Sequence, residues 1–259
     1  MRYIVCIKQV PDTTDVRINP ETNTLVREGV ESVVNPFDMY AVELALFLRD
    51  KFGGEVISIS MGPPQAEEAL RETISVGVDR AYLITDKSFA GADTLATSRT
   101  LVAAIRYIGG ADVIFVGKQA TDGDTAQVGP GIAESMNIGQ VTFVRDVMEI
   151  RDGNLLALRM TDKGRSEIEA RLPVLLSVTK LDREPRLPSL RGKLRAKKEK
   201  IEHLDAKSLS LPEETVGLAG SPTQVIKIFT PQRHTQGEIQ RGKPEELGDW
   251  LAGKLRNIL

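Results

Sequence analysis

The chain has 259 residues, 41% of them hydrophobic and 27% charged, which is the composition of a folded globular protein. Its 34 basic and 36 acidic residues leave a net charge of −2, which gives no argument for binding nucleic acid or an anionic membrane. The single cysteine, Cys6, excludes an internal disulfide and a four-cysteine metal centre, and two histidines, His203 and His234, exclude a histidine-rich centre.

The first residues lack the long apolar stretch and the cleavage site of a signal peptide. No apolar run approaches the ~18–20 residues that span a bilayer. We therefore expect a cytoplasmic protein without a membrane span.

The first half of the chain alternates strands with helices. A β-branched run at 3–7 predicts a buried strand, followed by a small hairpin at 16–26. Asn35 and Pro36 are a favoured N-cap and first helical residue. Further strands are expected at 56–61, 80–85 and 113–116, and helices at 65–76, 93–108 and from 122–125 to 136. This alternation predicts a parallel sheet covered on both faces, with ligands bound at the carboxyl ends of its strands.

The second half has a different character. Segments 140–150, 154–159, 165–171 and 174–178 predict strands that we expect to be antiparallel additions to the sheet. The last 79 residues contain six of the 13 prolines, and residues 191–200 carry six basic side chains and one acidic side chain, a net charge of +5. We therefore expect a nucleotide-binding domain at 1–180 and an extended arm at 181–259, which lies on a partner because it cannot bury its own core.

Two loops at the carboxyl edge could hold a phosphate. Residues 117–131 leave a strand and open a helix, whose free N–H groups favour anions, although a helix cap with a turn explains the same residues. In 91–98, the hydroxyl groups of Thr94, Thr97 and Ser98 lie within about one helical turn, and the alternative is that Asp93 is a simple N-cap. Asp122 and Asp124 alone are poor evidence for a metal, and the basic run lacks the aromatic residues that accompany nucleic-acid binding.

Several of these segments together resemble one known family. The loop 8–12, the helix start 35–38 and the segment 117–129 resemble the β subunit of electron transfer flavoproteins. The Glu-Pro-Arg sequence at 184–186, the basic run after it and 231–233 are similar to the C-terminal arm of that family. The resemblance covers essentially the whole chain, in order.

The resemblance implies an α/β fold with a parallel, doubly wound, Rossmann-like sheet that binds an adenine nucleotide, and an arm that wraps an α subunit carrying a redox-active FAD. In most members the β subunit holds a structural AMP, and the heterodimer shuttles electrons from acyl-CoA-type dehydrogenases. In the electron-bifurcating branch it holds a second FAD. That FAD takes a hydride from NADH and sends one electron to ferredoxin or flavodoxin and the other, through the α-subunit FAD, to a dehydrogenase.

Residues 91–98 resemble the Ala-Asp-Thr-x-Ala-Thr-Ser motif of the bifurcating branch, which favours FAD over AMP in this subunit. The competing hypotheses are a scaffold subunit that holds AMP and a free-standing nucleotide sensor, against which the long arm argues.

The same resemblance implies site residues. The expected cofactor-binding residues are Cys6, Asn35, Pro36, Phe37, Asp38, Met61, Asp93, Thr94, Thr97, Ser98, Asp122, Gly123, Asp124, Thr125, Gln127, Val128, Gly129, Pro130 and Gly131. The expected partner-docking residues are Leu181, Glu184, Pro185, Arg186, Leu187 and Leu190. AMP-type members anchor their partner dehydrogenase through a leucine just before the Glu-Pro-Arg region, and because this chain departs from that pattern, Leu181, Leu187 and Leu190 are the three candidates for the anchor. No catalytic side chain and no metal ligand is expected.

Overall fold

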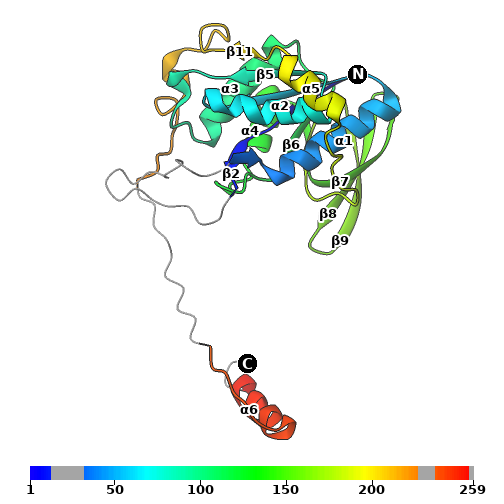
Figure 1. Ribbon diagram of the computed structural model, residues 1–259, viewed down its shortest axis with the longest axis vertical. Coiled ribbons are helices and arrows are strands. Elements are labelled where there is room, and N and C mark those ends of the chain that lie inside the picture. The colour runs from blue at the N-terminus through cyan, green and yellow to red at the C-terminus, as the bar shows by residue number, and fades with distance from the viewer. Residues whose placement is uncertain (13–31, 227–236, 257–259) are drawn as a thin grey trace. The chain divides into compact units, whose positions relative to one another are not determined.

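The computed structural model describes residues 1–12, 32–226 and 237–256 and divides into two compact units, Met1–Ile226 and Lys227–Leu259 (Figure 1). The second unit contains the helix α6 (Pro244–Arg256). The hairpin predicted at 16–26 lies outside the described residues. The strands on either side of that region, β2 (Gln9–Pro11) and β3 (Ser32–Val34), pair in antiparallel fashion.

Within the described residues, nine strands of the first unit form one sheet in the order β11-β5-β4-β1-β6-β10-β7-β8-β9. The strands are β1 (Arg2–Cys6), β4 (Glu55–Met61), β5 (Arg80–Ile84), β6 (Val113–Gly117), β7 (Gly139–Arg151), β8 (Asn154–Thr161), β9 (Gly164–Arg171), β10 (Val174–Val178) and β11 (Glu202–Leu204). All neighbours from β11 to β7 are parallel, and only β7–β8 and β8–β9 are antiparallel. The predicted α/β class with a parallel sheet is confirmed.

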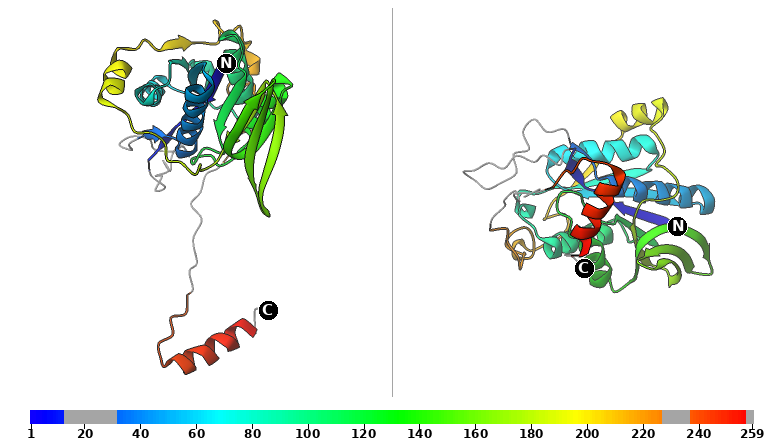
Figure 2. Two further views of the ribbon diagram at one scale, coloured as in Figure 1. Left: turned by 90° about the vertical axis from the view of Figure 1, so that its right-hand side faces the viewer. Right: turned by 90° about the horizontal axis from the view of Figure 1, so that it is seen from below.

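Helices cover both faces of this sheet (Figure 2). The helices α1 (Pro36–Phe52), α2 (Glu67–Val76) and α5 (Leu190–Lys198) lie on one face, and α3 (Thr94–Tyr107) and α4 (Val128–Met136) lie on the other. Short 3-10 helices occupy Pro64–Ala66, Lys87–Phe89 and Glu213–Thr215. Along β1, Tyr3 and Val5 join the core beneath α1 and α2, whereas Ile4 and Cys6 join the core beneath α3 and α4.

Two predicted elements differ from the structure. The strand β10, expected to be antiparallel, lies between β6 and β7 and is parallel to both, and all five of its residues are buried. A continuous apolar run such as Val174–Val178 is typical of a strand covered on both faces, which is usually a parallel one. The helix expected to open at 122–125 begins only at Val128, so the loop before it is longer than predicted.

Residues 181–226 belong to the first compact unit. Leu181, Ala196 and Ile201 are buried in the core beneath α1 and α2, and Leu204 and Leu209 are buried in the core on the opposite face. The segment also contributes the edge strand β11, which pairs with β5. The expectation that the arm wraps an α subunit stays a prediction.

Candidate functional site

The strand order places the candidate site at the carboxyl edge of the sheet, between β1 and β6. The chain adds β4 and β5 on one side of β1 and then crosses to add β6 on the other side. The order of the strands therefore reverses between β1 and β6, and α/β sheets bind ligands in the crevice at such a point. The loops after β1 and after β6 flank this position.

The side chains of Asn35 and Asp38 connect these two loops. The carboxylate of Asp38 accepts hydrogen bonds from Lys8 N at 2.7 Å, Gly117 N at 3.1 Å and the side-chain amide of Asn35 at 2.9 Å. That amide also donates to the carbonyl oxygen of Gln119 at 2.9 Å, and its oxygen accepts from Thr121 N at 3.2 Å. We call this arrangement the Asn35–Asp38 knot. Asn35 precedes the helix as predicted but does not cap it with its side chain.

The knot lies out of contact with solvent. Asn35 is 1% exposed and Asp38 is 5% exposed. Burial raises the pKa of Asp38 to about 7, although its hydrogen-bond donors and the ammonium of Lys8 favour the charged form. Burial, reinforced by the negative charge of Asp38, also raises the pKa of the Cys6 thiol, so Cys6 is a neutral side chain in the core.

The loop after β6 lies at the surface. Residues 121–127 are exposed, and both Asp124 and Ala126 adopt positive φ angles, of 52° and 55°. Asp122 forms an ion pair with the ammonium of Lys8 at 2.7 Å, and the side chain of Gln119 donates to Asp124. Left-handed backbone at non-glycine residues costs energy and gathers at functional loops, which marks this loop as a candidate for ligand contact.

The two predicted phosphate loops meet. The hydroxyl of Thr94, at the start of α3, donates to the side-chain oxygen of Gln127, at the start of α4, at 3.0 Å. The side chain of the N-cap residue Gln127 makes no hydrogen bond to the first N–H groups of α4, and among the described residues nothing lies within 4 Å of where a Cβ of Gly123 would stand. Free helical N–H groups beside small, exposed residues can receive the oxygens of a phosphate.

Asp93 is the N-cap of α3, which is the simpler of the two roles expected for the segment 91–98. Its carboxylate accepts from the N–H groups of Leu95 and Ala96 at 3.0 Å each. It also accepts from Thr223 N at 3.1 Å and the Thr223 hydroxyl at 2.8 Å. Burial raises the pKa of Asp93, but these hydrogen bonds outweigh burial and leave it below its usual value. The carboxylate is therefore engaged within the chain.

Ser98 is turned away from the loops. It is 0% exposed, and its hydroxyl donates to the carbonyl oxygens of Thr94 at 2.7 Å and Val128 at 3.2 Å. A Cβ at Gly131 would lie 2.5 Å from this hydroxyl, and one at Gly129 would lie 2.7 Å from Val116. Ser98 and these glycines let α4 pack closely on α3 and β6, and their expected contact with a ligand stays a prediction.

The remaining expected cofactor residues lie along the same edge. Met61 ends β4 and is half-buried, Pro36 is exposed and Phe37 is half-buried at the start of α1. Thr97 is half-buried in the first turns of α3, and Val128 and Pro130 are half-buried in the first turn of α4. Thr125 is exposed in the loop before α4.

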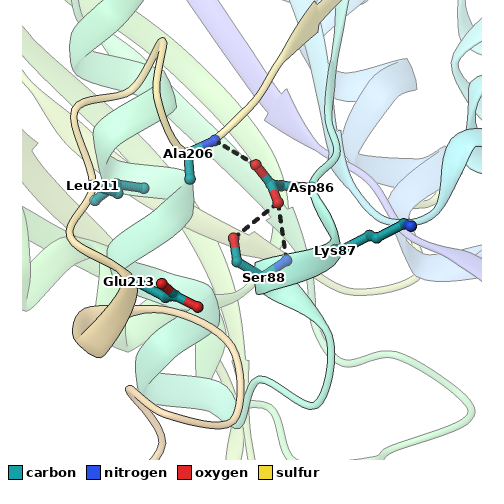
Figure 3. Close-up of a pocket in the computed structure, with 6 residues that line it drawn as sticks. All are labelled: Asp86, Lys87, Ser88, Ala206, Leu211 and Glu213. Atoms are coloured by element: carbon teal, nitrogen blue, oxygen red, sulfur yellow. Dashed lines mark hydrogen bonds between the residues drawn. The ribbon is translucent and has the colours of Figure 1, made fainter.

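A separate hollow lies at the carboxyl end of β5 (Figure 3). The carboxylate of Asp86 accepts from the N–H and the hydroxyl of Ser88, at 2.9 and 3.0 Å, and from Ala206 N at 3.1 Å. The backbone donors hold the pKa of Asp86 below its usual value. Asp86 thus links the loop after β5 to the segment after β11. The hollow is lined by Asp86, Lys87, Ser88, Ala206, Leu211 and Glu213.

The expected docking residues fall into two groups. Leu181 is 2% exposed and lies in the core, whereas Leu187 and Leu190 are 88% and 78% exposed and are therefore the better placed docking candidates. Arg186 forms a two-pronged ion pair with the buried carboxylate of Glu43, at 2.8 and 3.1 Å. Glu184 accepts from the Tyr40 hydroxyl at 2.9 Å. Pro185 lies between these two side chains and is half-buried.

Sequence reasoning missed several of these contacts. The side chains of Lys8 and Gln119 lie at the site, but no sequence pattern indicates their contacts. Thr223, which donates to the carboxylate of Asp93, lies 130 positions after Asp93 in the chain. In the described parts of the chain, no three acidic, histidine or cysteine side chains gather as a metal site. Over the same residues, no helix has the length and apolar character needed to cross a membrane.

Comparison with known proteins gives a consistent result. A family model described as the electron transfer flavoprotein domain matches residues 22–209. The electron transfer flavoprotein subunit beta of Thermoanaerobacterium thermosaccharolyticum is 48% identical over 258 residues, which cover 99% of this chain and 98% of the relative. Protein FixA of Bradyrhizobium diazoefficiens is 45% identical over 238 residues, covering 89% and 83%. The caffeyl-CoA reductase-Etf complex subunit CarD of Acetobacterium woodii is 44% identical over 258 residues, covering 99% and 98%.

Proposed function

Because this chain belongs to the electron transfer flavoprotein family, as a β subunit that pairs with an α subunit in electron transfer, we propose that it binds FAD at the carboxyl edge of its sheet. Electrons would enter from NADH. They would leave to ferredoxin or flavodoxin and, through the FAD of the α subunit, to a dehydrogenase. A cytoplasmic location is part of the same proposal.

One observation carries the choice of site. The starts of α3 and α4 meet through the Thr94–Gln127 hydrogen bond of 3.0 Å, next to an exposed loop, and the N-cap residue Gln127 leaves the first N–H groups of α4 uncapped by its own side chain. Thr94, Thr97 and the first N–H groups of α4 would hold the pyrophosphate, and the loops after β1 and β6 would hold the adenosine end. When bound, FAD supplies the hydride and single-electron chemistry, for which the protein provides position and electrostatics.

The names of the relatives support the bifurcating branch. One relative is named FixA, and another is named as a subunit of a caffeyl-CoA reductase-Etf complex. A complex of that kind joins an electron transfer flavoprotein to a reductase that acts on an acyl-CoA compound. By analogy, the partner dehydrogenase of this chain would dock at the exposed Leu187 and Leu190.

The alternative is a structural AMP with a non-bifurcating shuttle function. Asp93, Thr94, Thr97 and Ser98 are the polar residues of the segment that resembles the bifurcating motif, and two of them, Asp93 through its carboxylate and Ser98 through its hydroxyl, are engaged within the chain. A mononucleotide needs fewer phosphate contacts, so this observation favours AMP. The choice between FAD and AMP therefore depends on the hydroxyl groups of Thr94 and Thr97.

The double variant Thr94→Val, Thr97→Val tests the proposal. Valine has nearly the shape of threonine but cannot donate to a phosphate oxygen, so we expect the co-purified heterodimer to lose at least half of the FAD assigned to the β subunit. Thr161→Val, at the end of β8, is the matched control and should retain it. Flavin content is read from the absorbance of the acid-released cofactor. A double variant with wild-type flavin content would remove the role assigned to both hydroxyls.

A further inference from the structure

The Asn35–Asp38 knot joins three separate stretches of chain. It takes the N–H group of Lys8 from the loop after β1, the N–H group of Gly117 from the end of β6, and both the Gln119 carbonyl and the Thr121 N–H from the following loop. The main chain of Asn35 adds a bond from its own N–H to the carbonyl of Lys8 at 2.8 Å. Gly117 ends β6, which pairs with β1, and the loop residues Lys8, Gln119 and Thr121 flank the switch point of the sheet.

We propose that Asn35 and Asp38 are positioning residues, which hold the loops after β1 and β6 in the arrangement that receives the adenine nucleotide, and that uptake of a proton by Asp38 releases the nucleotide. This inference rests on the proposed function, since it concerns the same site. Neither side chain needs to touch the ligand.

The packing around Gly117 shows how closely the carboxylate is fitted. A Cβ at this residue would lie 2.2 Å from Asp38 Oδ1 and 2.9 Å from Asp38 N, so only glycine lets β6 approach the start of α1 this closely. The carboxylate is 5% exposed, and water cannot readily replace a lost protein partner there. A change at Asp38 is therefore transmitted directly to both loops.

The ionised carboxylate is the form that this geometry requires. Three N–H groups point at its two oxygens, from Lys8, Gly117 and Asn35. A protonated carboxyl group has one O–H donor and is a weaker acceptor than the carboxylate, so it binds these buried N–H groups less strongly. The loops that carry the N–H groups of Lys8 and Gly117 are then held less firmly.

The charges near Asp38 come from several elements. The ammonium of Lys8 favours the carboxylate but is partly neutralised by Asp122, at 2.7 Å. Cys6, from β1, is neutral. Lys118, which follows β6, places its ammonium 5.8 Å from the Phe37 ring and 5.4 Å from the Phe143 ring. Burial outweighs the favourable charges and raises the pKa of Asp38 to about 7, so the proton exchanges near neutral pH.

The first test uses the wild-type heterodimer and amide hydrogen exchange at pH 5.5 and pH 8, corrected for the intrinsic rate. The N–H groups of Lys8 and Gly117 donate to Asp38, whereas their neighbours Ile7 and Lys118 donate to the main-chain oxygens of Ile59 and Val178, at 2.9 and 2.7 Å. We expect at least tenfold lower protection at pH 5.5 for Lys8 and Gly117, and unchanged protection for Ile7 and Lys118. Equal behaviour of the two pairs would overturn the inference.

The second test follows nucleotide retention. Acid-released FAD and AMP are counted after gel filtration of the heterodimer between pH 5.5 and pH 8.5. The wild type should retain its nucleotide above pH 7 and lose it progressively below, whereas Asp38→Asn should retain at least tenfold less at pH 8 and show a flat profile. Asp152→Asn, at an exposed turn where φ is 52°, is the matched control and should follow the wild type.

The outcomes separate the two proposals. A wild-type heterodimer without nucleotide at any pH contradicts the proposed function, and the amide exchange still shows whether the knot opens. A wild type that holds nucleotide, together with an Asp38→Asn variant of the same content and pH profile, contradicts the positioning role alone. If Asp38→Asn does not fold, the exchange experiment decides by itself, since it needs no variant.

Discussion

Individual side chains at the candidate site serve the packing of the chain more than the sequence indicates. Asn35 and Pro36 predict a helix start, and the helix does begin there, but the side chain of Asn35 bonds to Asp38 and to a loop 84 positions away. The glycines at 129 and 131 suggest a phosphate loop, yet both admit neighbouring protein atoms. Residue type and spacing predict which loops matter. They do not reveal the long-range partner that uses each hydrogen bond.

Gly131→Ala tests this packing role. The new methyl group would lie 2.5 Å from Ser98 Oγ and 3.1 Å from Ser98 Cβ, so we expect a loss of about 1–3 kcal/mol in the free energy of unfolding. Ser98→Ala in the same chain should recover part of that loss. Gly123→Ala is the control, because nothing lies within 4 Å of its added Cβ. The three variants are compared by denaturant unfolding, and a Gly131→Ala chain as stable as Gly123→Ala would disprove the packing role.

The sequence predicts individual strands and helices better than the contacts between distant segments. The alternation of strands and helices through residue 117 is confirmed, because hydrophobic periodicity is a local property. The path of 181–186 along α1 depends on Tyr40, Glu43 and Asp50, a stripe of polar side chains on one face of that helix. The apolar residues of α1 alone suggest a helix that is buried on several sides. No local signal in the sequence indicates that Glu184 and Arg186 bind its polar stripe.

Arg186→Gln tests this attachment. Glu43 is 7% exposed, and the substitution leaves its carboxylate buried without the guanidinium, which we expect to cost about 3 kcal/mol in stability. Arg151→Gln removes two exposed ion pairs, with Glu149 and Asp152, and should cost less than about 1 kcal/mol. Thermal unfolding of the heterodimer distinguishes the two variants. Similar midpoints for both would show that the Glu43–Arg186 pair does not fix the segment.

At the scale of the whole molecule, the sequence predicts the parallel sheet, its carboxyl edge and the family. It does not predict that β10 enters between β6 and β7, because the two antiparallel strands β8 and β9 separate β7 from β10 along the chain. The position of that strand depends on pairing between distant segments, which local patterns do not encode. The predicted position of the site does not depend on β10, because the switch between β1 and β6 lies away from the far end of the sheet.

The FAD proposed for the β subunit distinguishes a bifurcating protein from a simple shuttle. The most direct measurement is the number of nucleotides released by acid from the purified heterodimer, with FAD and AMP counted separately. We expect two FAD and no AMP for each heterodimer. One FAD and one AMP would contradict this expectation and would make this chain the structural subunit of a non-bifurcating electron shuttle.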